Sequence, residues 1–161
     1  MRDAIGGAFE RRHRRHRRQR GASAWITGVE VDDCAAVGVD VAERARARLD
    51  RVTVRRTTGV GQAFAIKNGA VVEAVASGSI DSAVCGIAVY GASAKWDSGT
   101  ITKSPVGACV AKPQMPLDCL RNATRYVDVG IPAQADRYDL PSSIYDAPAS
   151  VCPTVEARAI P

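Results

Sequence analysis

Residues 63–74 read AFAIKNGAVVEA, so that two apolar runs flank the dipeptide Asn68-Gly69. Asparagine and glycine accept the positive φ angles that a type I′ turn requires, and this turn joins neighbouring antiparallel strands. Runs of about four to eight mostly apolar residues bounded by turn residues are typical of β-strands. The stretch therefore predicts a β-hairpin, and it favours a β-rich fold for the surrounding chain.

Short strand candidates continue on the C-terminal side of this hairpin. They are residues 84–90 (VCGIAVY), 100–103 (TITK) and 106–111 (VGACVA). Turn residues recur about every 8–12 positions, a spacing that is typical of all-β sandwiches and barrels. The core should be built from small side chains, because aromatic residues make up only 5% of the chain. We predict a mainly β fold, a small barrel or sandwich over residues 51–132, and find no internal repeat of useful length.

The preceding segment, residues 21–50, supports two alternatives. The stretch Asp40-Val41-Ala42-Glu43 resembles a helix-capping box, and apolar residues recur at every fourth position from Val41 to Leu49. This pattern favours one short helix over residues 41–50 within an anchoring segment. The same stretch also alternates arginine with apolar residues, which would fit a strand with one arginine face.

Positive charge is concentrated in the first twenty residues. The net charge of the chain is +5, whereas residues 1–20 hold eight arginines against two carboxylates, a net of +6, which leaves −1 for the remainder. Residues 11–20, RRHRRHRRQR, contain no apolar side chain, and their like charges repel one another. We therefore predict that residues 1–20 form a basic arm that is disordered in isolation.

This arm is the candidate nucleic-acid-binding segment. Each arginine can neutralise one backbone phosphate and release counterions, which gives sequence-independent binding that weakens with salt. The alternative interpretation is that the arm only reflects translation of a GC-rich upstream stretch, or a start codon assigned too early. The candidate phosphate-binding residues are Arg11, Arg12, Arg14, Arg15, Arg17, Arg18 and Arg20.

The sequence predicts neither a catalytic centre nor a metal site. Both histidines, His13 and His16, lie inside the arginine run, where the positive field repels cations. The rest of the chain therefore lacks the histidine base that serine or cysteine nucleophiles ordinarily use. We expect no enzymatic activity, no catalytic residue, no bound metal and no cofactor.

The five cysteines predict buried free thiols. Their number is odd, and no Cys-x-x-Cys pair is present, so neither a disulfide framework nor a zinc site is indicated. The cysteines are Cys34, Cys85, Cys109, Cys119 and Cys152.

The two ends of the chain carry no recognisable membrane or targeting signal. No run of about 18 apolar residues is present, and no apolar segment follows the basic N-terminus, so we expect a cytoplasmic protein. Residues 133–161 are rich in proline, and we predict an extended tail that wraps a neighbour or stays mobile.

Four segments together carry a family resemblance. They are residues 60–66 (VGQAFAI), 85–90 (CGIAVY), 95–102 (KWDSGTIT) and 106–111 (VGACVA). Their order resembles the small β-barrel decoration or cement proteins of tailed-phage heads, over about residues 52–130. The resemblance implies a structural protein of the virion that sits on a capsid lattice as an oligomer, but it carries over no individual site residue. That family usually lacks an arginine-rich tail, so the resemblance does not explain residues 1–50 or 133–161.

The predicted function is that of a non-enzymatic, phage-like structural protein, either capsid decoration or a coat component. Its partners would be capsid protein or other copies of itself, and it would be assembled in the host cytoplasm without a membrane. The alternative is a nucleic-acid-binding β-barrel module that grips phosphates with the arm. In that alternative, phosphate contacts would extend to Arg44, Arg46, Arg48, Arg55 and Arg56, and bases would stack on Trp25, Trp96 or Tyr90. A third interpretation, an enzyme with a metal held by carboxylates or thiolates, has the least support.

Overall fold

The computed structural model describes residues 21–59, 61–111, 115–135 and 152–155. The arm and most of the proline-rich tail lie outside these described residues. The predictions for residues 1–20, including the seven candidate phosphate-binding arginines, and for most of the segment 133–161 therefore stay predictions.

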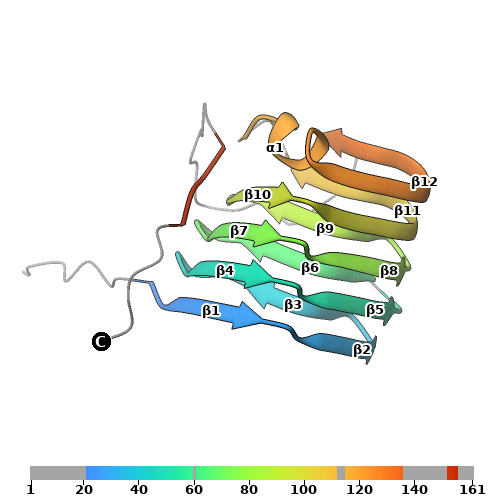
Figure 1. The fold of residues 1–161 in the computed structure, drawn as a ribbon, viewed down its shortest axis with the longest axis horizontal. Helices are drawn as coiled ribbons and strands as arrows, with labels where there is room; N and C mark the ends of the chain where they lie inside the picture. The colour runs from blue at the N-terminus through green and yellow to red at the C-terminus, as the bar shows by residue number, and fades with distance from the viewer. Residues whose placement is uncertain (1–20, 60, 112–114, 136–151, 156–161) are drawn as a thin grey trace, which may run out of the picture.

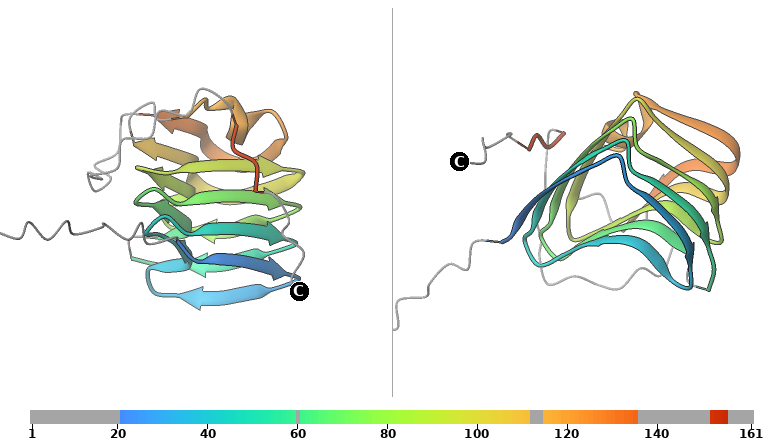
Figure 2. Two further views of the ribbon diagram at one scale, coloured as in Figure 1. Left: turned by 90° about the vertical axis from the view of Figure 1, so that its left-hand side faces the viewer. Right: turned by 60° about the horizontal axis from the view of Figure 1, so that its bottom comes forward.

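The described chain winds as a parallel β-solenoid, in which each coil contributes strands to three sides (Figure 1). The views in Figure 2 show the coils stacked around a three-sided section. The first side consists of β1 (Ser23–Thr27), β4 (Arg46–Asp50), β7 (Val71–Val75) and β10 (Ser93–Asp97). The second begins with β2 (Glu30–Cys34), β5 (Thr53–Thr57) and β8 (Gly78–Ser82), and the third with β3 (Val37–Val41), β6 (Gln62–Lys67) and β9 (Cys85–Tyr90).

Two long strands complete the second and third sides at the C-terminal end. They are β11 (Gly99–Ala111), which pairs with both β8 and β9, and β12 (Thr124–Ala135), which pairs with β11. A single turn of helix, α1 (Asp118–Arg121), lies between them in the chain. Every strand pair is parallel, so the predicted barrel or sandwich is wrong.

A repeat of 22 to 25 residues underlies the solenoid, because positions 23, 46, 71 and 93 lie in register. Along β4, Ala47 and Leu49 are buried, whereas Arg46 is exposed and Arg48 is partly exposed. Inward positions of successive coils therefore stack into an apolar core of mostly small side chains. Its two largest fully buried side chains, Trp96 and Phe64, pack edge to face, and the indole Nε1 of Trp96 donates a hydrogen bond of 2.8 Å to the carbonyl of Ser77.

The corners of the coils also stack. Between the first and second sides, a residue with positive φ recurs in register, and the first three of these residues donate their backbone N–H to a carbonyl of the next coil. Only glycine adopts this backbone region without a steric cost, so the in-register hydrogen bonds must hold the other residues there. The column is Gly28 (φ 63°), Arg51 (53°), Ala76 (49°) and Ser98 (55°).

The predicted hairpin at residues 63–74 is wrong, although its turn residues behave as expected. Asn68 and Gly69 have φ angles of 54° and 75°, as a type I′ turn would require. They form a corner of the solenoid instead, because β6 pairs with β3 and β9 whereas β7 pairs with β4 and β10. The local conformation was predictable, but the pairing partner was not.

The short helix predicted over residues 41–50 is also wrong. This stretch holds the end of β3, a corner and β4, so the alternative of a strand with one arginine face is confirmed. Residues 21–50 supply β1 to β4 and are thus continuous with the sheets formed by the following residues.

Four of the five cysteines form disulfides, which corrects the prediction of free thiols. Cys85 and Cys109 join β9 to the next coil with a Cα–Cα distance of 6.2 Å, and their separation of 24 residues corresponds to one coil. Cys119 in α1 is joined to Cys152 at 5.3 Å, and Cys34 is free. Disulfides persist mainly in oxidising compartments, so these two bonds do not favour the expected cytoplasmic location.

Among the residues that the structure describes, no helix combines the length and the apolar character needed to cross a bilayer.

The parallel register can be tested by cross-linking. Ile80 and Thr102 are register partners on adjacent coils, about 4.8 Å apart as neighbouring strands, so the variant I80C/T102C should form a disulfide under mild oxidation. The control R55C/T102C places its cysteines two coils apart and should remain reduced, as read by mass spectrometry of peptides. Equal oxidation of the two variants would contradict the stacking of coils.

The strand assignment of residues 46–50 predicts opposite effects at adjacent positions. Ala47 is 2% exposed, so A47D buries an unpaired charge and should lower the free energy of unfolding by at least about 2 kcal/mol. The control R46D changes an exposed position and should cost less than about 1 kcal/mol. Urea unfolding measures both, and a well-tolerated A47D would refute the strand.

Candidate functional site

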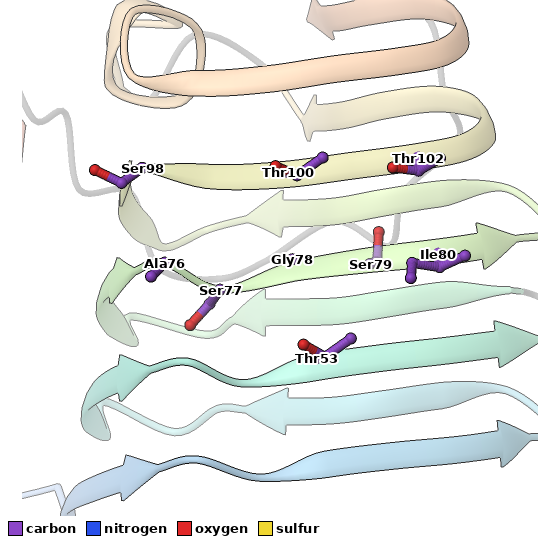
Figure 3. A pocket seen from close by; sticks show the side chains of 9 residues that line it. All are labelled: Thr53, Ala76, Ser77, Gly78, Ser79, Ile80, Ser98, Thr100 and Thr102. Carbon is purple, nitrogen blue, oxygen red and sulfur yellow. The ribbon is translucent and has the colours of Figure 1, made fainter.

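A hollow on the second side is lined by several hydroxyl groups and by no titratable side chain. It has a volume of about 170 Å³ and is shown in Figure 3. The hydroxyl of Ser77, one of the lining residues, already makes two hydrogen bonds within the protein. It accepts one from the N–H of Val52 and donates one to the carbonyl of Val75. The lining of the hollow consists of Thr53, Ala76, Ser77, Gly78, Ser79, Ile80, Ser98, Thr100 and Thr102. This set supplies no acid, base or charge for chemistry on a bound molecule.

The described ranges contain no candidate metal site, because no three histidine, cysteine or acidic side chains there come close enough together to hold a metal ion. The two histidines of the chain lie outside the described residues.

The N-terminal end of the solenoid is an open edge. Strands β1, β2 and β3 each pair on one side only, with β4, β5 and β6, and no other described strand pairs with them. Two large apolar side chains are exposed here, Trp25 at 50% and Val29 at 40%. Such an edge presents unpaired backbone groups to which another chain segment can add as a strand.

The backbone groups that face this open side can be identified along β1. Arg46 donates its N–H to the carbonyl of Ala22 over 2.8 Å, and Gly28 donates to the carbonyl of Asp50 over 2.9 Å, so even-numbered residues bond to β4. Alternate residues of a strand direct their backbone groups to opposite neighbours. The N–H and C=O groups of residues 23, 25 and 27 therefore point away from the solenoid.

The C-terminal end, by contrast, is closed or blunted. Helix α1 packs against β10 on the first side, where Met115 and Leu120 are buried and the sulfur of Met115 accepts a hydrogen bond of 3.4 Å from the N–H of Ala94 (Figure 1). The last strand, β12, contains Pro132, which cannot donate to a further strand. The two ends of the solenoid are thus unequal: the first coil presents three unpaired strand edges, whereas the other end has α1 packed on β10 and the single strand β12, which contains Pro132.

Charge alternates between successive coils. Residues 21–45 hold five carboxylates and one arginine, a net of −4, whereas residues 46–70 hold six cations and one carboxylate, a net of +5. Residues 71–92 then sum to −2 and residues 93–111 to +1. The open first coil is therefore the most acidic part of the described solenoid.

Ion pairs connect the first two bands of charge. Arg55 Nε lies 2.6 Å from Glu30 Oε1, and Lys67 Nζ lies 2.5 Å from Asp40 Oδ2. Arg56 reaches both Asp32 and Asp33, and its hydrogen bond to Asp33 holds the pKa of that carboxyl below its ordinary value. The hydrogen bond from Lys67 to Asp40 correspondingly raises the pKa of the lysine. All of these cations approach from the second coil.

A carboxylate in the interior of the stack is contacted from both sides. Glu73 in the third coil lies 3.8 Å from Arg48 in the second coil and 3.9 Å from Lys95 in the fourth. It also accepts a hydrogen bond of 3.0 Å from the N–H of Val155, and its side chain is only 13% exposed. The carboxylates of the first coil differ from Glu73, because the cations in their described ion pairs all come from the second coil, on one side of them.

The residues proposed for the nucleic-acid-binding alternative differ in how accessible they are in the structure. Trp96 is 1% exposed and Tyr90 is 8% exposed, so neither ring is available to stack on a base. Trp25 is exposed, but the guanidinium of Arg48 lies 5.4 Å from the centre of its ring. Arg55 and Arg56 are held in the ion pairs above, Arg46 is exposed, and the seven arginines of the arm lie outside the described residues.

Sequence reasoning missed the open coil, because it missed the repeat. The repeat leaves only short matches in the sequence. Val29-Glu30-Val31 corresponds to Val52-Thr53-Val54 one coil later, and Gly86-Ile87-Ala88-Val89 corresponds to Gly107-Ala108-Cys109-Val110. The alternation of net charge at intervals of about one coil would have been a second signal.

Comparison of the chain with protein-family models, with curated proteins and with solved structures finds no match. Any functional assignment therefore depends on the geometry and charge of the solenoid itself.

Proposed function

We propose that this chain is a non-enzymatic structural protein that acts through contacts with other protein chains, made at the open first coil. The observation that carries this proposal is the unpaired edge of β1, β2 and β3 at one end of a solenoid whose other end is closed or blunted.

The partner that fits this edge is an extended protein segment. Unpaired backbone groups bind a further strand through main-chain hydrogen bonds, and the exposed Trp25 and Val29 add apolar surface to the contact. Other copies of the chain are the first candidates, since every copy carries the same edge. Capsid protein is the second, but the predicted resemblance to phage decoration proteins implied a β-barrel, and the solenoid removes that structural support.

A second candidate function is sequence-independent nucleic-acid binding by the arm. It is favoured by the seven arginines within residues 11–20. The described surface adds little to it, because two of the three aromatic side chains proposed for base stacking are buried.

A pair of substitutions at one edge position tests the structural proposal. Thr27 is exposed, and its N–H points to the open side, so T27P should block strand addition while leaving the bonds to β4 intact. The control T27A keeps the N–H. We expect full-length wild type and T27A to exceed the mass of one chain in light scattering, and T27P to remain a monomer.

Low salt and ~0.5 M salt should both be used, with nucleic acid read from the 260/280 absorbance ratio. Single-chain mass for wild type under both conditions, without capture of a capsid protein, would overturn the structural proposal. Nucleic acid that co-purifies at low salt and is lost when residues 11–20 are deleted would favour the second candidate.

A further inference from the structure

We propose that residues 11–20 of this same chain dock along the open edge of the first coil and regulate its access to other chains. This inference rests on the proposed function of the edge and names the segment that competes for it. Four features of the chain support it: where the segment is attached, how far it reaches, its charge, and the need of an open edge for cover.

The attachment point lies beside the acidic edge. Arg20 is followed directly by Gly21, whose Cα is so close to the carbonyl of Arg44 that an added Cβ would collide with it. Gly21 therefore stacks on the corner between the third and first sides, which follows β3 and includes Glu43. The arginine segment therefore begins where the open edge of β3 ends.

The segment is long enough to follow that edge. Ten residues in extended conformation span up to about 33 Å, whereas the five residues of β3 span about 17 Å. In a regular solenoid, the residues that precede the first side would lie over the third side. Residues 11–20 can therefore run along β3 and reach β2.

Charge complementarity selects this occupant. The segment carries seven arginines and no acid, and the first coil, residues 21–45, has a net charge of −4. Arginines on the open side would give these carboxylates the second cation that Glu73 already has in the interior. At low salt, a second copy of the acidic edge, placed edge to edge, would instead bring like charges together, a repulsion that added salt screens.

Covering the edge also removes a liability. Exposed strand edges promote uncontrolled association, and native proteins commonly cover them with a loop or with charge. A segment tethered at Gly21 has an effective concentration on the order of millimolar at the edge, so weak contacts suffice. Salt or a polyanion should release it. Association through the edge should consequently increase with salt, the opposite of association held by ion pairs between chains.

Limited trypsin digestion of the full-length protein tests docking independently of association. We compare wild type with an edge variant, D32N/D40N/E43Q, and with a control, D81N/D97N/D128N, which removes the same charge from later coils. Docked arginines are shielded, so the arm of the edge variant should be cleaved about fivefold faster at low salt. The control should match wild type, and ~0.5 M salt should accelerate cleavage in wild type.

Cleavage is followed by intact mass, with the free peptide RRHRRHRRQR as the rate reference at each salt and far-UV circular dichroism as the check on folding. If the edge variant fails to fold, the wild type alone still tests docking. Its cleavage rate, divided by that of the free peptide, should rise with salt. Equal rates in all three proteins would overturn the proposal, as would equal acceleration in the control. Protection that depends on protein concentration would also overturn it, because the occupant would then be the arm of a second copy.

Failure of docking and failure of the proposed function remain distinguishable. Absence of association at either salt removes the function of the edge whatever the trypsin result. Association that is independent of salt, together with an arm that trypsin cleaves as fast as the free peptide, would contradict docking of the arm but not the proposed function of the edge.

Discussion

In-register hydrogen bonding between parallel coils is the constraint on which the rest of this structure depends. Each strand repeats the direction and position of the strand in the coil before it, so inward, outward and corner residues form columns along the solenoid. The columns concentrate apolar side chains in a narrow core. They also hold residues such as Arg51 and Ala76 in a left-handed conformation that neither would adopt alone. Cross-coil disulfide and ion pairs are further consequences of the same stacking.

A stack of coils must end, and its two ends are treated differently. At the C-terminal end, α1 covers the first side and Pro132 blunts the last strand. At the N-terminal end, three strands keep unpaired edges and belong to the coil with the most negative net charge of the described solenoid. Because backbone edges bind strands and acidic edges bind cations, the first coil combines two forms of recognition in one place. The proposed protein contact and its regulation by the arginine segment both follow from that combination.

Much of the local structure could be predicted from the sequence, whereas the architecture could not. Asn68-Gly69 indicated positive φ angles correctly, but a corner of a solenoid and a hairpin turn share that requirement. The alternation around Arg46 and Arg48 is confirmed as a strand, although a helical spacing of Val41 and Leu49 competed with it. Parallel partners lie one coil away, at a separation of 22 to 25 residues, and the matching segments are only three or four residues long. The disulfide between Cys85 and Cys109 was missed for the same reason.

Residue-resolved amide hydrogen exchange of the full-length protein at ~0.5 M salt, at a concentration low enough that light scattering gives the mass of one chain, tests the central claim, an open edge on an in-register stack, most directly. Along β1, the N–H groups of residues 23, 25 and 27 should exchange rapidly, and those of residues 24 and 26, which bond to β4, should exchange slowly. Strand β7, which has a neighbour on both sides, should be protected at every position. Uniform protection along β1, equal to that of β7, would contradict an open first coil.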